Sequence, residues 1–223
     1  MTPPPTTVLV VAKAPVPGLA KTRLAASIGD AAAADVAAAA LLDTLDAVAA
    51  APVSARVVAM TGDLQRACRS EEIRQRLKSF AVVAQRGTDF AERLVCAHAD
   101  AAAAAGEHPI VQIGMDTPQV SSELIAGCAA GLGDAQAVLG MAADGGWWVL
   151  GVRSAVMAEC LRPVPMSQPD TGALTLEALR NKGYGVALVE ELADVDTVAD
   201  VEGVRRCCAP DSRFAAATRA AGL

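Results

Sequence analysis

The chain has 223 residues, of which 53% are hydrophobic and 3% aromatic, and its formal net charge is −6. This length suits one α/β domain with a sizeable core, and the negative charge argues against a general nucleic-acid binder, whose affinity comes from cationic contacts to phosphate. Acidic residues interrupt the apolar stretches well short of a membrane span, and the first residues, MTPPPTT, do not form a signal peptide, so we expect a cytoplasmic protein.

Apolar runs of strand length alternate along the chain with segments in which apolar residues recur at helical spacing. In chain order, we predict strands at 7–11, 55–60, 80–84, 109–113, 135–141, 147–152 and 186–190 and helices at 30–50, 63–78, 89–105, 121–132, 171–182 and 198–207. This alternation predicts a mostly parallel sheet with helices on both faces. The strand at 147–152 directly follows another strand, which predicts an antiparallel pairing there.

The helix at 171–182 carries signals for both of its ends. Thr171 is expected as its N-cap, and Gly183 follows its last residue at the C′ position. Just before it, prolines between Arg162 and Pro169 predict an irregular loop over a site. The sequence has no internal repeat and no long linker, so we predict a single domain over residues 1–223.

Charged residues and glycines gather where the predicted strands end. The segments that follow the first, fourth, fifth and last strands read KAPVPGLAKTR, GMDTPQ, AADGGWW and ELADVDT. In open α/β sheets, ligands bind beyond the carboxyl ends of the strands. We therefore predict the functional site at this edge of the sheet.

The first of these segments is a basic loop. Lys13, Lys21 and Arg23 can converge on an anion if the loop curls back over the strand, and Gly18 lets the chain turn or lets its amide approach an oxygen. A diphosphate is the natural ligand for such a loop. The loop is not a Walker A motif, because the residue immediately before Lys21 is not a glycine. Taken alone, it is equally compatible with a solvent-exposed connection.

Acidic residues follow two other predicted strands. Asp116 ends the fourth strand, where its carboxylate can hold Mg²⁺ against phosphate oxygens or, alternatively, cap the next helix. Asp194 and Asp196 follow the last strand, and we expect them on opposite faces of an extended segment, with at most one pointing into the site. Two carboxylates opposite three cations have the charge expected of a metal–diphosphate site.

Several motifs occur in an order that resembles a known family. They are AKAPVPGLAKTRLA, DTL at 43–45, GMDTPQ, DGGWW and DVDTVADV, within about residues 7–204. In this order they resemble a GT-A-fold transferase family, the glycosyltransferases of the arsenosugar-biosynthesis type, which is related to 2-phospholactate guanylyltransferase. Each motif alone is weak, but the ordered set covers nearly the whole chain. The resemblance implies an α/β fold of the GT-A, nucleotide-diphospho-sugar transferase-like type, a three-layer αβα sandwich.

The resemblance also implies roles for residues at the strand ends. Lys21 and Arg23 would face the donor phosphates, Asp116 would be the metal carboxylate, and Asp194 would be a second acid of the metal site. The predicted residues are Ala12, Lys13, Gly18, Lys21, Arg23 and Asp89 for nucleotide and phosphate binding; Asp116, Asp144 and Arg23 for catalysis; Gly145, Gly146, Trp147 and Trp148 for substrate binding; and Asp116, Asp194 and Asp196 for Mg²⁺ or Mn²⁺.

The sequence departs from these relatives at two places. The guanylyltransferases carry Thr-Asn after the glycine pair, whereas this chain has Trp147 and Trp148. Adjacent strand residues face opposite ways, so we expect one indole in the core and the other in the cleft against sugar C–H groups, although both could serve packing. The second departure is the single acid of MDTP, where many metal-dependent glycosyltransferases have D-x-D. Asp89, which follows the third strand, could contact a base or ribose, or it could place a negative charge at the N-terminus of a helix, where the helix dipole favours one.

The leading hypothesis is a Mg²⁺-dependent glycosyltransferase that moves a sugar from a nucleotide-diphosphate donor to a small-molecule acceptor, with Asp144 orienting or deprotonating the acceptor. The first alternative is a nucleotidyltransferase that joins an NTP to a phosphorylated acid and releases pyrophosphate. The second is an inactive nucleotide-binding protein. Neither a nucleic-acid partner nor a membrane span is expected, and a homodimer is left open.

Overall fold

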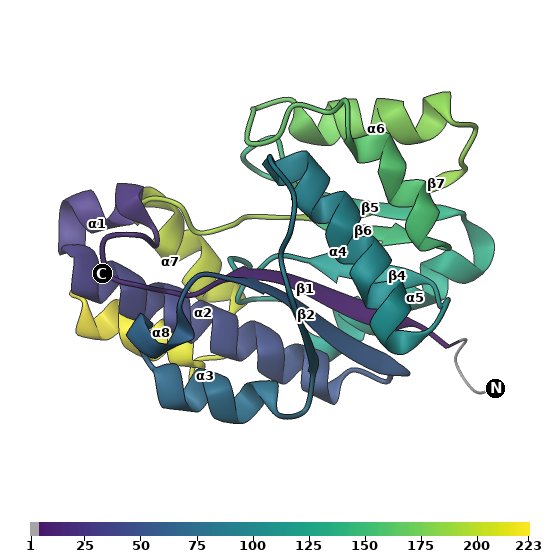
Figure 1. Cartoon of the computed structure of the whole chain (residues 1–223). Helices are drawn as coiled ribbons and strands as arrows, with labels where there is room; N and C mark the ends of the chain where they lie inside the picture. Colours follow the sequence, from purple (N-terminus) through teal and green to yellow (C-terminus); the bar gives the residue numbers. More distant parts are fainter. Residues whose placement is uncertain (1–4) are drawn as a thin grey trace.

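The computed structural model describes residues 5–223, which contain a sheet of seven strands (Figure 1). The strands are β1 (Thr7–Lys13), β2 (Ala55–Thr61), β3 (Ala81–Ala84), β4 (Ile110–Ile113), β5 (Ala137–Ala142), β6 (Trp147–Val152) and β7 (Val186–Leu192). Their order across the sheet is β3-β2-β1-β4-β6-β5-β7. Within the described residues, only β6 runs antiparallel to its neighbours, β4 and β5. The predicted mostly parallel sheet with one antiparallel strand is confirmed.

Helices cover both faces of this sheet, as predicted. They are α1 (Thr22–Ile28), α2 (Asp30–Ala50), α3 (Ser70–Leu77), α4 (Phe90–Ala105), α5 (Ser122–Asp134), α6 (Thr171–Asn181), α7 (Val198–Cys207) and α8 (Arg213–Ala220), with short 3₁₀ helices η1 (Leu64–Arg66) and η2 (Ala155–Leu161). Side chains of α2, α3 and α5 form a hydrophobic cluster with one face, and those of α4, η2 and α6 form another with the opposite face. The architecture is therefore a three-layer αβα sandwich.

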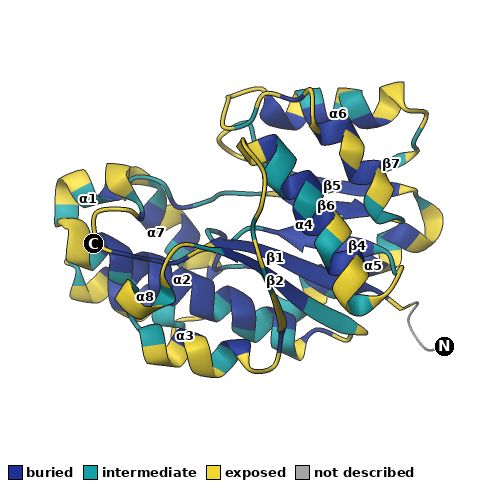
Figure 2. Ribbon diagram, in the orientation of Figure 1, coloured by how far each residue is buried: buried dark blue, intermediate teal, exposed yellow. Residues whose placement is uncertain are grey.

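Helix α2 is buried on two sides, which explains its alanine-rich sequence. Leu41 and Leu45 pack against the sheet, whereas Val36 and Ala39 pack against α1, α7 and α8. Figure 1 shows α1, α7 and α8 grouped around α2, and Figure 2 shows most of α2 as buried. A helix that is apolar on all sides needs such a position between two layers.

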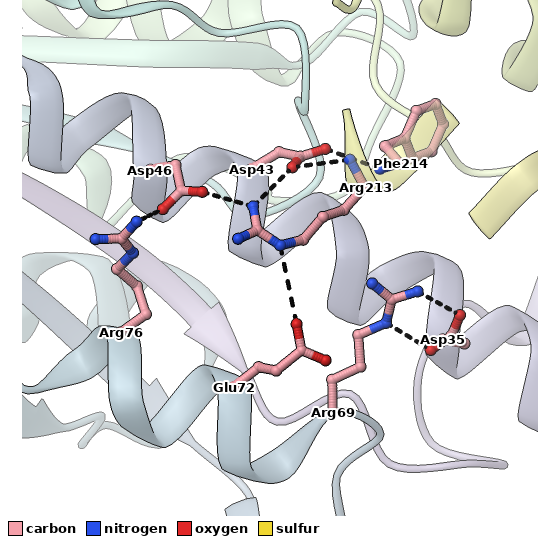
Figure 3. Close-up of polar contacts among 8 residues, drawn as sticks. All are labelled: Asp35, Asp43, Asp46, Arg69, Glu72, Arg76, Arg213 and Phe214. Carbon is pink, nitrogen blue, oxygen red and sulfur yellow. Dashed lines mark hydrogen bonds and ion pairs between the residues drawn. The ribbon is translucent and has the colours of Figure 1, made fainter. Parts of the chain in front are cut away.

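Polar contacts fasten α8 and α3 to α2 (Figure 3). The carboxylate of Asp43 accepts hydrogen bonds from the amides of Arg213, at 3.2 Å, and Phe214, at 2.8 Å. It therefore satisfies amides that the first turn of α8 leaves without helical partners. Asp46 pairs with Nη1 of Arg213 at 2.5 Å and also with Arg76. Asp43, in the DTL motif, is thus a structural residue.

The predicted helix at 63–78 is wrong in part. The segment divides into η1 and α3 at Arg69, whose φ of 49° lies in the left-handed region. Arg69 donates to both carboxylate oxygens of Asp35 on α2, at 2.7 and 2.8 Å. This contact joins distant parts of the chain, and no local periodicity reveals it.

The start of α6 differs from the prediction by one residue. Asp170 is the N-cap, and Thr171 is the first helical residue, with its hydroxyl donating to the Pro165 carbonyl at 2.8 Å. Gly183 follows the helix with φ of 79°, as expected for a C′ glycine. Helices α1 and α8 and the 3₁₀ helix η2 were not predicted.

Two expectations concern the chain as a whole. Residues 1–4 of the predicted domain lie outside the described residues, and the single-domain assignment stays a prediction. None of the described helices has the length and apolar character needed to cross a membrane.

Candidate active site

Segments that leave the carboxyl ends of three strands lie side by side. The amide of Lys13, at the end of β1, points at the sulfur of Met115, 3.1 Å away, in the segment after β4. The amide of Val195, after β7, donates to the carbonyl of Asp116 at 3.3 Å. The polar segments that the sequence places at strand ends therefore meet at one edge of the sheet.

Two adjoining cavities open at this edge. The first, here called the basic-loop cavity, has a volume of about 650 Å³ and is lined in part by Lys13, Lys21, Arg23 and Asp196. The second, called the central cavity, has a volume of about 520 Å³ and lies between α4, the sheet and the loop before α6. Both cavities are lined by Asp116, Asp144 and Asp194. These carboxylates stand where the two cavities join.

The basic loop turns back over the end of β1. Gly18 has φ of 77°, and Lys21, the residue before α1, has φ of 47°. A left-handed backbone at a non-glycine residue costs about 1–2 kcal/mol. It places Lys21 Nζ 3.1 Å from Asp116 Oδ2, with the lysine side chain only 9% exposed. Arg23, 74% exposed, pairs with Asp196. The loop thus brings its cations to the acidic residues.

The acidic residues carry more negative charge than their cationic partners neutralise. Within the described chain, neither Asp144 nor Asp194 forms an ion pair with Lys or Arg. Burial, together with the negative charges of Asp144, Asp116 and Asp196, raises the pKa of Asp194 to about 6, and the charge of Lys21 opposes this rise. Such mutual repulsion of carboxylates favours the binding of another cation.

The donor set fits Mg²⁺ bound together with phosphate. Residues 5–223 contain no group of three His, Cys, Asp or Glu side chains close enough to hold a metal ion alone. Mg²⁺ needs fewer protein ligands, because it retains waters and is often held by one or two carboxylates plus substrate phosphates. Asp116 and Asp194 supply the hard oxygen donors that it prefers. The alternative role of Asp116 as a helix cap is wrong, since Ser121 caps α5 by accepting from the amide of Leu124.

The glycine pair after Asp144 forms a tight turn under the loop that precedes α6. Gly145 has φ of 90°, and a Cβ there would lie 1.8 Å from the carbonyl oxygen of Pro169. Its carbonyl accepts from the amide of Gly172 at 2.8 Å, and Asp144 accepts from the amide of Gly146 at 2.8 Å. Gly145 therefore holds this turn against the neighbouring loop and does not line either cavity, whereas Asp144 lines both.

The two tryptophans after this turn face opposite sides of the sheet. Trp148 is 3% exposed, packs in the cluster on the α2 face, and donates from Nε1 to the carbonyl of Glu190 at 2.9 Å. Trp147 is half-buried, packs on the α4 face and lines the central cavity. Trp148 also lines the central cavity, but its indole is part of the core, and the half-buried Trp147 is the one placed to contact a ligand.

Other predicted residues lie differently from expectation. Asp194 and Asp196 share a face and both line the basic-loop cavity, because residues two apart in an extended segment point the same way; Val195 between them is buried. The expectation of opposite faces is wrong. Asp89 caps α4 by accepting from the amide of Glu92 at 2.8 Å, and it lines neither cavity. Gly18 also lines neither, whereas Ala12 lines the central cavity.

Some polar residues of the central cavity were not among the predicted site residues. Gln85 donates from its side-chain amide to the carbonyls of Ala12 and Ala59, at 2.8 and 2.9 Å. Gln112 and Arg93 line the same cavity. Gln112 could have been identified from the sequence, because it is a polar residue inside the apolar run IVQI of β4.

Solved structures share this fold. A candidate nucleotide-diphospho-sugar transferase from Desulfovibrio desulfuricans G20 is 26% identical, with a TM-score of 0.85 over 96% of this chain and 94% of its own. The 4-diphosphocytidyl-2C-methyl-D-erythritol synthase of Anaerococcus prevotii DSM 20548 has 13% identity and a TM-score of 0.58, over 89% of this chain and 94% of its own. Rv0371c from Mycobacterium tuberculosis H37Rv, in complex with manganese, has 20% identity and a TM-score of 0.54, over 90% of this chain and 97% of its own.

These similarities confirm the predicted fold, which is of the nucleotide-diphospho-sugar transferase-like type. The arsenosugar detail of the resemblance stays a prediction. No protein of curated function matches the chain in sequence. A family model matches residues 44–168, more than half of the chain, and the chain belongs to this family, which is described as an uncharacterized protein conserved in bacteria (DUF2064).

Proposed function

We propose that the chain is a metal-dependent transferase that moves a sugar from a nucleotide-diphosphate donor to a small-molecule acceptor. The observation that carries this proposal is the meeting of the basic loop with the under-neutralised carboxylates where the two cavities join. The 26% identity to a candidate nucleotide-diphospho-sugar transferase over nearly the full length of both chains supports it.

The basic loop would bind the donor diphosphate. Lys13, Lys21 and Arg23 all line the basic-loop cavity, and guanidinium and ammonium groups bind phosphate oxygens with charge-assisted hydrogen bonds. Asp116 and Asp194 would hold Mg²⁺ or Mn²⁺ beside the phosphates, with Asp196 holding Arg23 in place. When bound, the ion would supply charge neutralisation for the departing nucleoside diphosphate.

Asp144 would act on the acceptor. It lines both cavities, so its carboxylate can reach a hydroxyl in one while the donor occupies the other. The bond between the anomeric carbon and the diphosphate oxygen breaks, and a bond from that carbon to the acceptor oxygen forms. The hydroxyl proton passes to Asp144, and the nucleoside diphosphate leaves.

A nucleotidyltransferase is the alternative, because the cations that line the basic-loop cavity would also suit a triphosphate. A phosphate oxygen of the acceptor would then attack the α-phosphorus of an NTP, and pyrophosphate would leave. A third possibility, an inactive nucleotide-binding protein, is disfavoured by the joint presence of Lys21, Arg23 and Asp116 around one cavity.

Product analysis separates these functions. The full-length protein is incubated with Mg²⁺ or Mn²⁺ and either nucleotide-sugars or NTPs, together with a panel of hydroxylated and phosphorylated acceptors. We expect release of nucleoside diphosphate from a nucleotide-sugar. Release of pyrophosphate from an NTP would replace this proposal with nucleotidyl transfer, and nucleotide binding without either product would favour the inactive protein.

A further inference from the structure

The floor of the central cavity contains a polar group that the proposed reaction does not use. Gln112 is 2% exposed and stands beside Leu9 and Leu150, both of which belong to the cluster on the α4 face. Its Oε1 accepts no hydrogen bond within the described chain. Most buried polar groups have a hydrogen-bond partner, and a hydroxyl or N–H group of a ligand in the cavity would supply one to this atom.

Arg93, on α4, lines the same cavity and has no carboxylate partner within the described chain. Two other arginines are paired with carboxylates: Arg86 binds Asp100 at 2.7 Å, and Arg162 lies 3.5 Å from Glu92. The Arg93 guanidinium lies over the ring of Phe90, 5.6 Å from its centroid, and its Nε is buried without a partner. A partly buried guanidinium with free donors suits an anion.

The arrangement of the two cavities indicates which substrate carries that anion. Lys21 and Arg23 line only the basic-loop cavity, whereas Arg93 and Gln112 line only the central one. Lys13 lines both cavities, so two of the three cations assigned to the donor phosphates lie only on the other side of the shared carboxylates. A second substrate in the central cavity would meet the donor at Asp116 and Asp144.

We propose that the central cavity is the acceptor site and selects an acceptor with a carboxylate or phosphate, bound by Arg93, and a neighbouring hydroxyl or N–H group that donates to Gln112. This inference rests on the proposed function, since it assigns the second substrate of that reaction. It narrows the acceptor to small anionic molecules with a hydrogen-bond donor.

Calorimetric titration with three matched probes tests the selectivity. Glycerate carries a carboxylate, glycerol 3-phosphate carries a phosphate, and glycerol carries hydroxyl groups alone. We expect at least one anionic probe to bind the full-length protein and glycerol to show no binding at the same concentrations. The anionic probe that binds more tightly identifies which anion the site prefers.

Substitutions locate the bound probe. Arg93→Gln should weaken binding of the anionic probe by at least about tenfold, the loss expected for hydrogen bonds to a charged group, and Arg93→Lys should retain part of the affinity. Gln112→Met, which keeps the side-chain length but removes the acceptor, should weaken it severalfold. Arg86→Gln is the matched control and should leave the affinity unchanged. Unfolding midpoints of all variants check that each one folds.

The inference is overturned if neither anionic probe binds, if glycerol binds equally well, or if Arg93→Gln leaves the affinity unchanged. Displacement of the probe by UDP, CDP or GDP with Mg²⁺ would overturn the acceptor assignment, because the two substrates must bind together. Failure of the proposed function appears separately, as the absence of metal-dependent nucleotide binding. The probe titrations are also run without nucleotide or metal, so they are unaffected by that outcome.

Discussion

Two clusters in this chain both combine acidic with basic side chains, but they differ in how fully their charges are paired. The helix cluster joins α2, α3 and α8 and consists of Asp35, Asp43, Asp46, Arg69, Glu72, Arg76 and Arg213 (Figure 3). The site cluster consists of Lys21, Arg23, Asp116, Asp144, Asp194 and Asp196. Every carboxylate of the helix cluster pairs with an arginine, whereas Asp144 and Asp194 of the site cluster pair with no cation of the described chain.

In an acidic protein, a structural cluster can be distinguished from a site by how completely its charges are paired. Ion pairs that bind helices together can satisfy every partner, because nothing else must enter. A site that receives a cation and phosphates is left with unpaired groups around a cavity, and the raised pKa of Asp194 reflects its burial and the negative charges beside it. Changes in the two clusters should therefore affect different measurements.

The largest effect is expected from Asp116→Asn. The substitution keeps the shape of the side chain but removes a metal ligand, so turnover should fall by about 100-fold or more while the unfolding midpoint stays near that of the wild type. Initial rates and thermal unfolding check both parts. Asp46→Asn in the helix cluster is the control and should lower stability without this loss of turnover. An active Asp116→Asn variant with unchanged Mg²⁺ dependence would end the metal assignment.

We expect acid unfolding to depend on a residue that belongs to neither cluster. His98 is 0% exposed, and burial lowers its pKa to about 4. Its pKa in the unfolded chain is about 6.5, so below that pH the unfolded state binds a proton that the folded state does not. The stabilisation is complete above pH 6.5 and should decline by about 3 kcal/mol as the pH falls to 4.

Urea unfolding of the wild type and of His98→Gln between pH 7 and pH 4.5 measures this effect. The variant should show a flatter pH dependence, whatever its stability at pH 7. Equal pH dependence in the two proteins would place the acid sensitivity elsewhere, with the carboxylates of the helix cluster as the next residues to test.

Arg23→Ala tests whether the basic loop binds phosphate. Loss of its hydrogen bonds to a charged ligand should weaken nucleotide binding by about 1.5–3 kcal/mol, and stability should change little because the side chain is 74% exposed. Calorimetry of nucleotide binding measures the loss. Unchanged nucleotide affinity would mean that the loop is only a surface connection.

The smallest effect is expected from Asp43→Ala in the helix cluster. The substitution removes the acceptor for two amides at the start of α8, which should cost about 1–2 kcal/mol of stability, as for the loss of a helix cap. Nucleotide affinity should stay that of the wild type. A change in affinity without a change in stability would show that the two clusters are not separate.

Strong local patterns allowed most of the fold to be predicted. The bounds of α2 and α7 match the predicted helices, and each predicted strand is present within a few residues, because buried strands and long helices leave clear periodicities. The break at Arg69 could not be predicted, since its backbone conformation accompanies an ion pair with Asp35 in another helix. Helix α8 was missed because one of its N-terminal partners, Asp43, is remote in sequence.

The candidate site was predictable where it follows strand ends. Asp116, Asp144 and Asp194 were found because the carboxyl ends of strands meet at one edge. Arg93 could not be found in this way, because a charged residue in an amphipathic helix usually faces solvent. The structure distinguishes it from Arg86 and Arg162 in two ways, because Arg93 lines the central cavity and those two arginines have carboxylate partners.

The central claim is that the carboxylates of the site cluster bind a divalent cation together with nucleotide phosphates. Calorimetric titration of the wild-type protein with UDP, CDP and GDP, in Mg²⁺, in Mn²⁺ and in EDTA, tests it most directly. We expect the metal to raise the affinity for at least one nucleotide by about tenfold or more, through shared coordination of phosphate and carboxylate. Equal affinities with the metals and with EDTA would contradict it.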